Sequence, residues 1–421
     1  MNTNNQHISN DKEIKHEQHD AQQLFDTCSM QEPIMESSII DMEDGLDGAS
    51  NTGTAHDLHD LGFDEGWSST WESWIQELQE STARRYAGQL VPARVALAHK
   101  HLYRVVSTEG EWLAELSGQA RAGMALLSDW PTVGDWVAVA PRQAEGRATI
   151  VGVLPRRSTF GRKVAGGRRD TQIVAANADI ALLVTSMSRD FEPRRLERYA
   201  ALAWDSGAMP AVVLTKADEA DDPELFEAQA MQAVPGVDVY RVSAMTGEGM
   251  DELRARIAPG MTVVLVGSSG VGKSTLANAL TGTEQMLTQA ARSDDDRGRH
   301  TTTHRELLRL QGGAWLIDTP GMREVGMTAI DSEGLSNTFE DIESLAEQCR
   351  FSDCKHEREP GCAVREAIHT GELDSSRLRG YQKLQREIAY MRRSENTQLA
   401  RQHVQHNKKL SKMSSRPSKR R

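Results

Sequence analysis

A glycine-rich segment with one lysine and one serine at fixed spacing lies in the second half of the chain. It reads Gly267, Ser268, Ser269, Gly270, Val271, Gly272, Lys273, Ser274 and then Thr275. The apolar run Thr262–Val266 before it predicts a strand, and Lys273–Leu280 predicts a helix. In that context the glycines let backbone N–H groups surround a β-phosphate at a helix N-terminus. We therefore predict a nucleoside triphosphate site rather than a chance glycine turn, with Lys273 bridging the β- and γ-phosphates.

A magnesium ion is expected beside these phosphates. The Ser274 hydroxyl would bind it directly, and the Asp318 carboxylate, at the end of an apolar strand, would hold it through water. Asp318 is followed by Thr, Pro and Gly321, whose N–H would meet the γ-phosphate. A threonine from Thr301–Thr303 should complete the magnesium shell. We place Thr302 there, and the sequence leaves Thr303 equally open.

A second group of residues would read the base. It comprises Thr215, Lys216, Ala217, Asp218, Ser243 and Ala244. Guanine presents N1–H and N2–H₂ together, and the Asp218 carboxylate can accept from both, whereas adenine would leave it poorly paired. The Lys216 stem would cover the purine, and the turn at Ser243-Ala244 would offer a backbone N–H to O6. Threonine at position 215 keeps a hydroxyl but lacks the amide of the more usual asparagine, so we expect weaker anchoring there.

The order of these motifs is unusual. In an ordinary GTPase the phosphate loop comes first and the base-reading motifs come last. Here the base-reading residues 215–244 precede the phosphate loop at 267–275, and Asp318 follows both. The sequence therefore predicts a circularly permuted GTPase domain in which the same site is built from a rejoined chain.

The residue expected to orient the attacking water is missing. Many GTPases place glutamine just after the Asp-x-x-Gly motif, but here Met322 follows Gly321, and a thioether cannot orient water. Intrinsic hydrolysis should therefore be slow, near ~10⁻⁴ s⁻¹, until a partner supplies the missing group. His300 is the best internal candidate for a catalytic role, and an exposed switch residue is an equally weighted alternative.

Three of the four cysteines lie close together with a histidine between them. Cys349, Cys354, His356 and Cys362 supply three thiolates and one imidazole, a complete tetrahedral set for structural zinc. The alternative is buried free cysteines beside a surface histidine. The charged residues that flank these positions argue against a buried core.

The chain of 421 residues has a net charge of −12 that conceals an asymmetry. Residues 1–80 carry only Lys12 and Lys15 as fixed cations, whereas residues 392–421 hold ten Lys and Arg against Glu395. The basic end suits phosphate backbones. No apolar run approaches the length that spans a bilayer, and the polar N-terminus lacks a secretory core, so we expect a cytoplasmic protein without membrane contact.

The patterns predict a multidomain α/β protein. Five short strands over about residues 91–155 predict a small β-barrel, and alternating strands and helices over 173–335 predict a doubly wound α/β domain. The expected division is an acidic, largely disordered extension at 1–90, the barrel at 91–155, a basic linker at 156–172, the GTPase domain at 173–335, a helical zinc-knuckle domain at 336–391 and a basic disordered tail at 392–421. Within the extension, Leu58–Leu78 is expected to pack locally, as a short helix docked on the following domain, and a partner-binding motif is the alternative.

Together the permuted motifs, the preceding barrel and the following Cys-Cys-His-Cys knuckle resemble the bacterial ribosome small-subunit-dependent GTPase A family, RsgA. The resemblance covers about residues 91–391 and includes Gly298–Thr303 as the switch. It implies an oligonucleotide-binding barrel and a monomer that binds the 30S subunit and its 16S rRNA in the GTP form. It also implies that the 30S subunit stimulates hydrolysis and that a maturation factor such as ribosome-binding factor A is released. Thr215 and the acidic extension depart from the family pattern.

Two other functions fit parts of the sequence. One is an RNA-binding assembly module in which the nucleotide is mainly structural, but intact Lys273, Ser274 and Asp318 disfavour it. The other is a permuted GTPase for the large subunit, which the barrel and the zinc knuckle disfavour.

Overall fold

The computed structural model describes residues 57–78, 80–99, 101–163, 171–283, 305–318 and 332–390, together with residue 393. All described residues lie in one compact unit, Ala55–Arg421. Predictions for residues 1–56 and for the tail beyond residue 393 therefore lie outside the described residues. Among the described helices, none has the length and apolar character needed to cross a bilayer.

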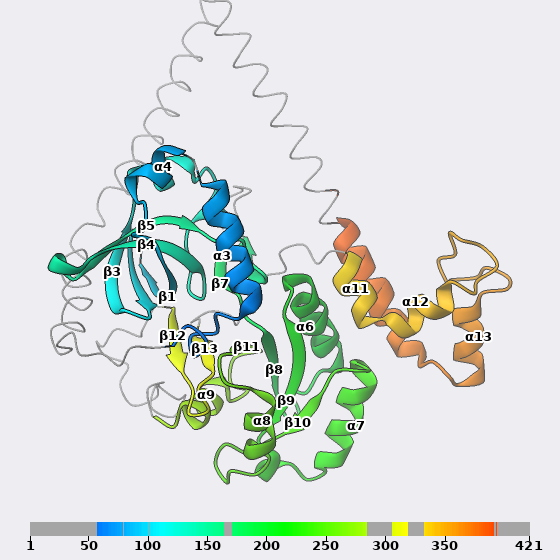
Figure 1. Ribbon diagram of the computed structural model, residues 1–421. Coiled ribbons are helices and arrows are strands. Elements are labelled where there is room, and N and C mark those ends of the chain that lie inside the picture. The colour runs from blue at the N-terminus through cyan, green and yellow to red at the C-terminus, as the bar shows by residue number, and fades with distance from the viewer. Residues whose placement is uncertain are drawn as a thin grey trace, which may run out of the picture. The chain divides into compact units, whose positions relative to one another are not determined.

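Five strands form the predicted small barrel (Figure 1). They are β1 (Val91–His99), β2 (Leu102–Ser107), β3 (Gly110–Leu116), β4 (Trp136–Arg142) and β5 (Arg147–Val153), with the short helix α5 (Gly118–Gly123) after β3. The strands pair in the order β1-β2-β3-β5-β4, and a β4–β1 pairing closes the barrel. Side chains such as Val105, Trp112 and Ile150 fill its interior.

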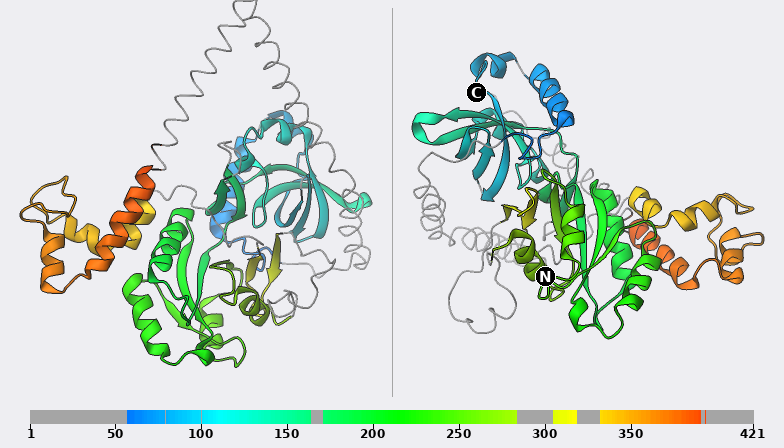
Figure 2. Two further views of the ribbon diagram at one scale, coloured as in Figure 1. Left: turned by 180° about the vertical axis from the view of Figure 1, so that it is seen from behind. Right: turned by 60° about the horizontal axis from the view of Figure 1, so that its bottom comes forward.

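The segment before the barrel is described over residues 57–78 and 80–90, whereas most of the extension predicted as largely disordered, residues 1–56, lies outside the described residues. It contains α3 (Glu65–Glu77), capped by the Asp64 carboxylate at 2.8 Å from the Trp67 N–H, and α4 (Glu80–Arg85). Trp67 is buried, with its ring 6.1 Å from that of Trp136 in the barrel. The views in Figure 2 show α3 beside the barrel strands. The short helix expected within Leu58–Leu78, docked on the following domain, is therefore present as α3.

The stretch predicted as a basic linker, residues 156–172, also differs from expectation. It contains β6 (Thr159–Lys163) and the start of β7 (Thr171–Ala176), which pair with each other. Phe160 is buried in the core, and the Arg156 guanidinium binds the buried Asp135 carboxylate at 2.7 Å. A buried aromatic ring and a buried ion pair fix residues 156–160, whereas residues 164–170 lie outside the described residues.

The predicted doubly wound domain follows. Its strands are β8 (Ile180–Ser186), β9 (Met209–Thr215), β10 (Val239–Arg241), β11 (Thr262–Val266), β12 (Glu306–Arg309) and β13 (Trp315–Asp318). Its helices are α6 (Pro193–Ser206), α7 (Pro223–Ala233), α8 (Met250–Arg256) and α9 (Lys273–Thr281). The strand order is β10-β9-β8-β11-β13-β12, parallel except for β12, a strand that the sequence analysis did not predict. On its other side β12 pairs antiparallel with β1 of the barrel, at Leu97 and Glu306.

Alternating residues of the central strands face two different layers of helices. In β8, Ala181 and Leu183 pack with Leu196 and Ala200 of α6. Their neighbours along the strand pack instead with α8 and α9, as Leu182 does in the cluster that includes Leu276. Burial on both faces explains why these strands are continuous apolar runs.

The barrel holds the start of the strand that leads into the phosphate loop. Arg94 of β1 is buried and donates from Nη1 to the Leu61 carbonyl at 2.7 Å and from Nη2 to the Thr262 hydroxyl at 2.5 Å. Thr262 is the first residue of β11. The N-terminal segment, the barrel and the GTPase sheet thus meet at one guanidinium.

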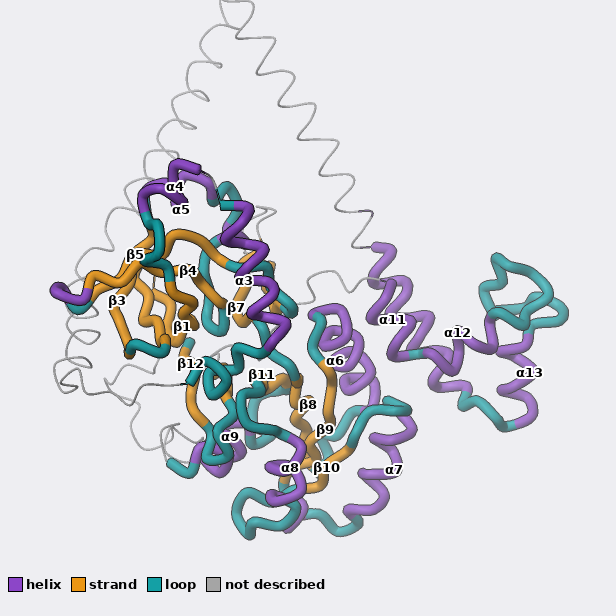
Figure 3. Tube along the Cα trace, viewed as in Figure 1, coloured by secondary structure: helices purple, strands orange, loops and turns teal. Residues whose placement is uncertain are grey.

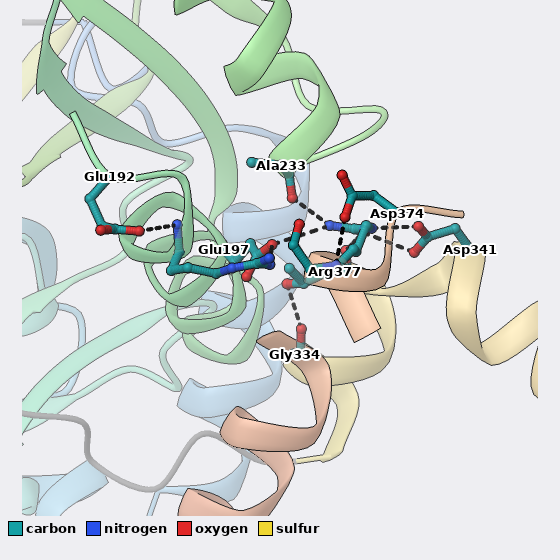
Figure 4. Close-up of polar contacts among 10 residues, drawn as sticks. Glu192, Glu197, Ala233, Gly334, Asp341, Asp374 and Arg377 are labelled. Carbon is teal, nitrogen blue, oxygen red and sulfur yellow. Dashed lines mark hydrogen bonds and ion pairs between the residues drawn. The ribbon is translucent and has the colours of Figure 1, made fainter. Parts of the chain in front are cut away.

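The C-terminal part of the described chain is helical, as predicted, and Figure 3 colours it as helices and loops. It comprises α11 (Ser332–Thr338), α12 (Glu340–Ala346), α13 (Ala363–Thr370) and a helix over 375–390. Arg377 connects this region to the GTPase domain, because its Nη1 donates to the Ala233 carbonyl of α7 at 2.6 Å. Two other nitrogens of the guanidinium, Nε and Nη2, donate to the Asp341 carboxylate. Figure 4 shows Glu197 of α6 on the other side of Arg377, with Oε1 3.7 Å from Nη1.

Glu197 should make stability depend on pH. Burial raises its pKa from 4.5 to about 7, although Arg194 and Arg377 oppose the shift. The folded state therefore prefers the protonated carboxyl, so this contribution to stability is complete below pH 4.5 and is lost as pH rises through about 7. We expect Glu197→Gln to gain up to about 3 kcal/mol relative to the natural chain between pH 5 and 7.5, measured by urea unfolding. The exposed Glu252→Gln is the control, and parallel pH profiles for Glu197→Gln and the natural chain would contradict the assignment.

Candidate nucleotide and metal sites

The predicted nucleotide residues lie at one edge of the GTPase sheet. β9, β10, β11 and β13 are parallel, so their carboxyl ends meet there. The chain runs outward from β8 through β9 to β10 in one direction and from β11 towards β13 in the other. The boundary between β8 and β11 is the point where doubly wound sheets bind ligands.

The phosphate loop has the backbone that its glycines predict. A Cβ on Gly267 would lie 2.3 Å from the Val184 carbonyl of β8, so only glycine fits there. Gly272 has φ 93° and caps α9, where the Leu276 N–H donates to its carbonyl at 2.8 Å. The loop thus leads directly into a helix N-terminus, the arrangement that binds phosphate.

Thr215 joins the base-reading segment to the phosphate loop. Its buried hydroxyl lies 2.6 Å from the Val271 carbonyl and 3.2 Å from the Thr185 carbonyl. The shorter contact is a hydrogen bond between two predicted motifs that are far apart in sequence. Threonine, which the sequence analysis treated as a weak substitute for asparagine, therefore does contact the loop.

The two base-reading motifs lie side by side. The Ala217 N–H donates to the Val242 carbonyl at 3.2 Å, and Ser243, fully buried, shapes the following turn by accepting from the Thr246 N–H at 3.1 Å. Lys216 adopts φ 63°, a conformation that lysine rarely takes, and Asp218 is exposed. Strain of this kind gathers at functional sites.

Two basic side chains contact the start of the phosphate loop. One is Lys273, which belongs to the predicted motif, and the other is Arg195, which does not. The Lys273 ammonium donates to the Gly267 carbonyl at 2.7 Å and also to the Ser268 carbonyl. Arg195 of α6 lies with Nη1 2.6 Å from the Ser268 hydroxyl, and the Tyr199 hydroxyl is 3.4 Å from the same oxygen. Nothing in the spacing of the motifs signals Arg195, because it comes from a helix more than 70 positions earlier.

Several predicted residues lie outside the described residues. They are His300, Thr301, Thr302, Thr303 and Gly321. The backbone of Asp318 ends β13 at the correct edge of the sheet, but its side chain is also outside the description. The roles of these residues remain predictions.

The four predicted metal ligands converge. One donor atom from each of Cys349, Cys354, His356 and Cys362 lies within 4.8 Å of every other. His356 Nδ1 is 3.4 Å from the Cys362 sulfur and 3.7 Å from the Cys349 sulfur. Three sulfurs and one nitrogen at this separation suit a tetrahedral divalent ion.

The local backbone holds these donors in place. Cys362 caps α13, and His356 has φ 58°, which turns its buried ring towards the sulfurs. The Arg350 N–H donates to the Gly361 carbonyl at 3.0 Å and closes the loop between the first and last ligands. Burial lowers the pKa of His356, which favours the neutral imidazole that binds metals.

Curated relatives match most of the chain. The small ribosomal subunit biogenesis GTPase RsgA 1 of Oceanobacillus iheyensis is 43% identical over 342 residues, covering 80% of this chain and 97% of its own. The corresponding RsgA 2 protein of Lactiplantibacillus plantarum is 45% identical and covers 72% of this chain and 84% of its own. The chain belongs to the RsgA GTPase family. It is therefore a GTPase, and the RsgA GTPase family model matches residues 153–328.

Solved structures agree with this family assignment. YjeQ from Thermotoga maritima has a TM-score of 0.55 at 27% identity and covers 71% of this RsgA-family chain and 99% of its own. YloQ, described as a circularly permuted GTPase, has a TM-score of 0.54 at 24% identity, which supports the fold. An ABC transporter model also matches residues 250–414, a range that includes the phosphate loop. Phosphate loops are common to many nucleotide-binding proteins, so this shorter match does not change the assignment.

Metal removal tests the cysteine–histidine cluster. We expect about one zinc per chain by elemental analysis, and Cys362→Ser should lower zinc affinity at least about a hundredfold, because loss of a direct ligand costs more than loss of an outer partner. His369→Ala, a histidine of α13 outside the cluster, should keep the zinc. Full zinc content in Cys362→Ser after dialysis against a chelator would contradict this ligand set.

Proposed function

We propose that this chain is a GTPase that binds the 30S ribosomal subunit and assists its late maturation. The observation that carries the proposal is the meeting of permuted motifs at one sheet edge, where Thr215 contacts Val271. The relatives are named small ribosomal subunit biogenesis GTPases, and these names support the 30S subunit as the binding partner in this proposal. A barrel of the size used by oligonucleotide-binding domains precedes the site and suits contact with 16S rRNA.

Each part of the nucleotide has a proposed partner. Backbone N–H groups of residues 267–275 surround the β-phosphate, and Lys273 moves from its loop carbonyls to the β- and γ-phosphate oxygens. Ser274 and Thr302 ligate Mg²⁺, and Asp318 holds it through water. The Gly321 N–H meets the γ-phosphate, a contact that is available only in the triphosphate state.

Base selection rests on an exposed carboxylate between two ordered segments. Asp218 accepts from guanine N1–H and N2–H₂, and Lys216 covers the purine face. Ser243 fixes the turn from which the Ala244 N–H donates to O6. This set of contacts is specific for guanine because adenine lacks both donors that Asp218 needs.

Hydrolysis is proposed to be slow alone and faster on the 30S subunit. Met322 stands where a water-orienting glutamine is usual, so the chain lacks that group. Engagement of the 30S subunit brings His300, or a group from the ribosome, to the attacking water. Hydrolysis then allows release of a maturation factor such as ribosome-binding factor A, and departure of the GTPase.

The remaining parts take supporting roles in this proposal. The structural ion at Cys349, Cys354, His356 and Cys362 is zinc, and it shapes the C-terminal helical region. The proposed domains are a barrel, a permuted GTPase domain, a helical zinc domain and a basic tail that contacts rRNA phosphates. The protein is proposed to act as a monomer in the cytoplasm.

GTP turnover with purified ribosomal subunits tests the proposal. Adding 30S particles should raise turnover from about 10⁻⁴ s⁻¹ by roughly 10³-fold or more, the range for a supplied catalytic group. Separated 50S particles and ATP in place of GTP are the controls, and His300→Ala in the same assay decides whether that side chain acts. Absence of any stimulation by 30S would favour the RNA-binding module with a structural nucleotide.

A further inference from the structure

Helix α6 contacts two distant parts of the protein with two adjacent stripes of side chains. Arg195 and Tyr199, one turn apart, reach the Ser268 hydroxyl in the phosphate loop at 2.6 and 3.4 Å. Arg195 Nη2 also donates to the Asp190 carbonyl at 3.2 Å, so the guanidinium is held at both ends. The start of the phosphate loop is thus fixed to α6 by charged and aromatic side chains.

The other stripe of α6 carries the contacts to residues 332–390. Arg198 Nη2 binds both carboxylate oxygens of Glu387, at 2.8 and 3.0 Å, and the Gly334 N–H donates to Asp205 at 2.8 Å. A Cβ on Gly334 would lie 2.3 Å from the Ala201 carbonyl, so α11 approaches α6 as closely as a glycine permits. These contacts reach the C-terminal helices, whereas Arg195 and Tyr199 reach Ser268.

A buried charge cluster completes this second interface. Figure 4 shows Arg377 reaching from the C-terminal helix to Ala233 and Asp341, with Glu197 of α6 opposite. Arg377 and Glu197 are both about 95% buried, whereas Asp341 at the edge of the cluster is partly exposed. Packed interfaces of this kind rearrange between discrete states rather than bend continuously.

We propose that α6 couples nucleotide binding to the C-terminal helical region, with Arg195 as the positioning residue at the phosphate loop. Binding of phosphates draws the Lys273 ammonium away from the Ser268 carbonyl, so Ser268 changes its partners. Arg195 and Tyr199 transmit that change to α6, and the stripe of Glu197, Arg198 and Asp205 transmits it to residues 332–390. Because coupling between two sites is reciprocal, release of the C-terminal region alters nucleotide affinity by the same factor.

Amide hydrogen exchange on the full, zinc-loaded chain tests the coupling. A nonhydrolysable GTP analogue at saturation should change exchange in the helix over 375–390 at least about fivefold, the lower limit of typical allosteric coupling. Arg195→Ala should bind the analogue but reduce that change below about twofold. Arg195→Lys, which keeps one donor for Ser268, should restore part of it. The exposed Arg189→Ala is the matched control and should respond as the natural chain does.

A second experiment changes the contact between α6 and the C-terminal helix. Arg198→Ala removes the half-exposed contact to Glu387 without touching the phosphate loop, and should change the ratio of GTP to GDP affinity at least about threefold by calorimetry. A full exchange response in nucleotide-saturated Arg195→Ala, or an unchanged affinity ratio in Arg198→Ala, would overturn the coupling. The proposal rests on the nucleotide site proposed above. Failure of the natural chain to bind the analogue would count against that site instead, so the two failures are distinguishable.

Discussion

The arrangement of the nucleotide site depends on one hydrogen bond, which the Thr215 hydroxyl donates to the Val271 carbonyl. Thr215 ends the strand that leads to the base-reading residues, and Val271 lies inside the phosphate loop. Base and phosphate of one nucleotide can be held together only if these segments keep a fixed separation. Because both groups are buried, breaking the bond would leave a carbonyl without a partner, at a cost of about 1–3 kcal/mol.

Circular permutation changes which segments adjoin the nucleotide site along the chain. The segment 177–179 joins the hairpin of β6 and β7 to β8, and Asn177 fixes the join by accepting from the Arg157 N–H at 2.9 Å and donating to the Gly134 carbonyl at 3.1 Å. At the other end, residues 319–331 join β13 to α11. Asp318, the proposed magnesium residue, is therefore followed in sequence by the helices that pack on α6. In an unpermuted chain the same site would border different neighbours.

Local chemistry explains which features the sequence could predict. Gly267 and Gly272 are required by a close approach and by a positive φ, and the apolar strands are continuous because both faces are buried. The spacing of Cys349, Cys354, His356 and Cys362 is short enough for one loop to bring the donors together. Such features depend on neighbouring residues, so their pattern remains visible in the chain.

The features that sequence reasoning missed all depend on distant partners. Arg156 looks like a linker charge in the sequence, because its ion pair with the buried Asp135 carboxylate forms only in the folded chain. Arg195 belongs to no motif, and its contact with Ser268 exists only because α6 packs on β8 and β9, beside the phosphate loop. Composition and spacing do not encode contacts of this kind, since the packing that creates them is tertiary.

Calorimetric titration with nonhydrolysable GTP and ATP analogues tests the central claim most directly, because a site built by these converging segments must choose its base through Asp218. The account predicts at least about a hundredfold preference for the guanine nucleotide, and a loss of at least tenfold of that preference in Asp218→Asn, from the removal of charge-assisted bonds. Equal affinity for the two analogues in the natural chain would contradict it.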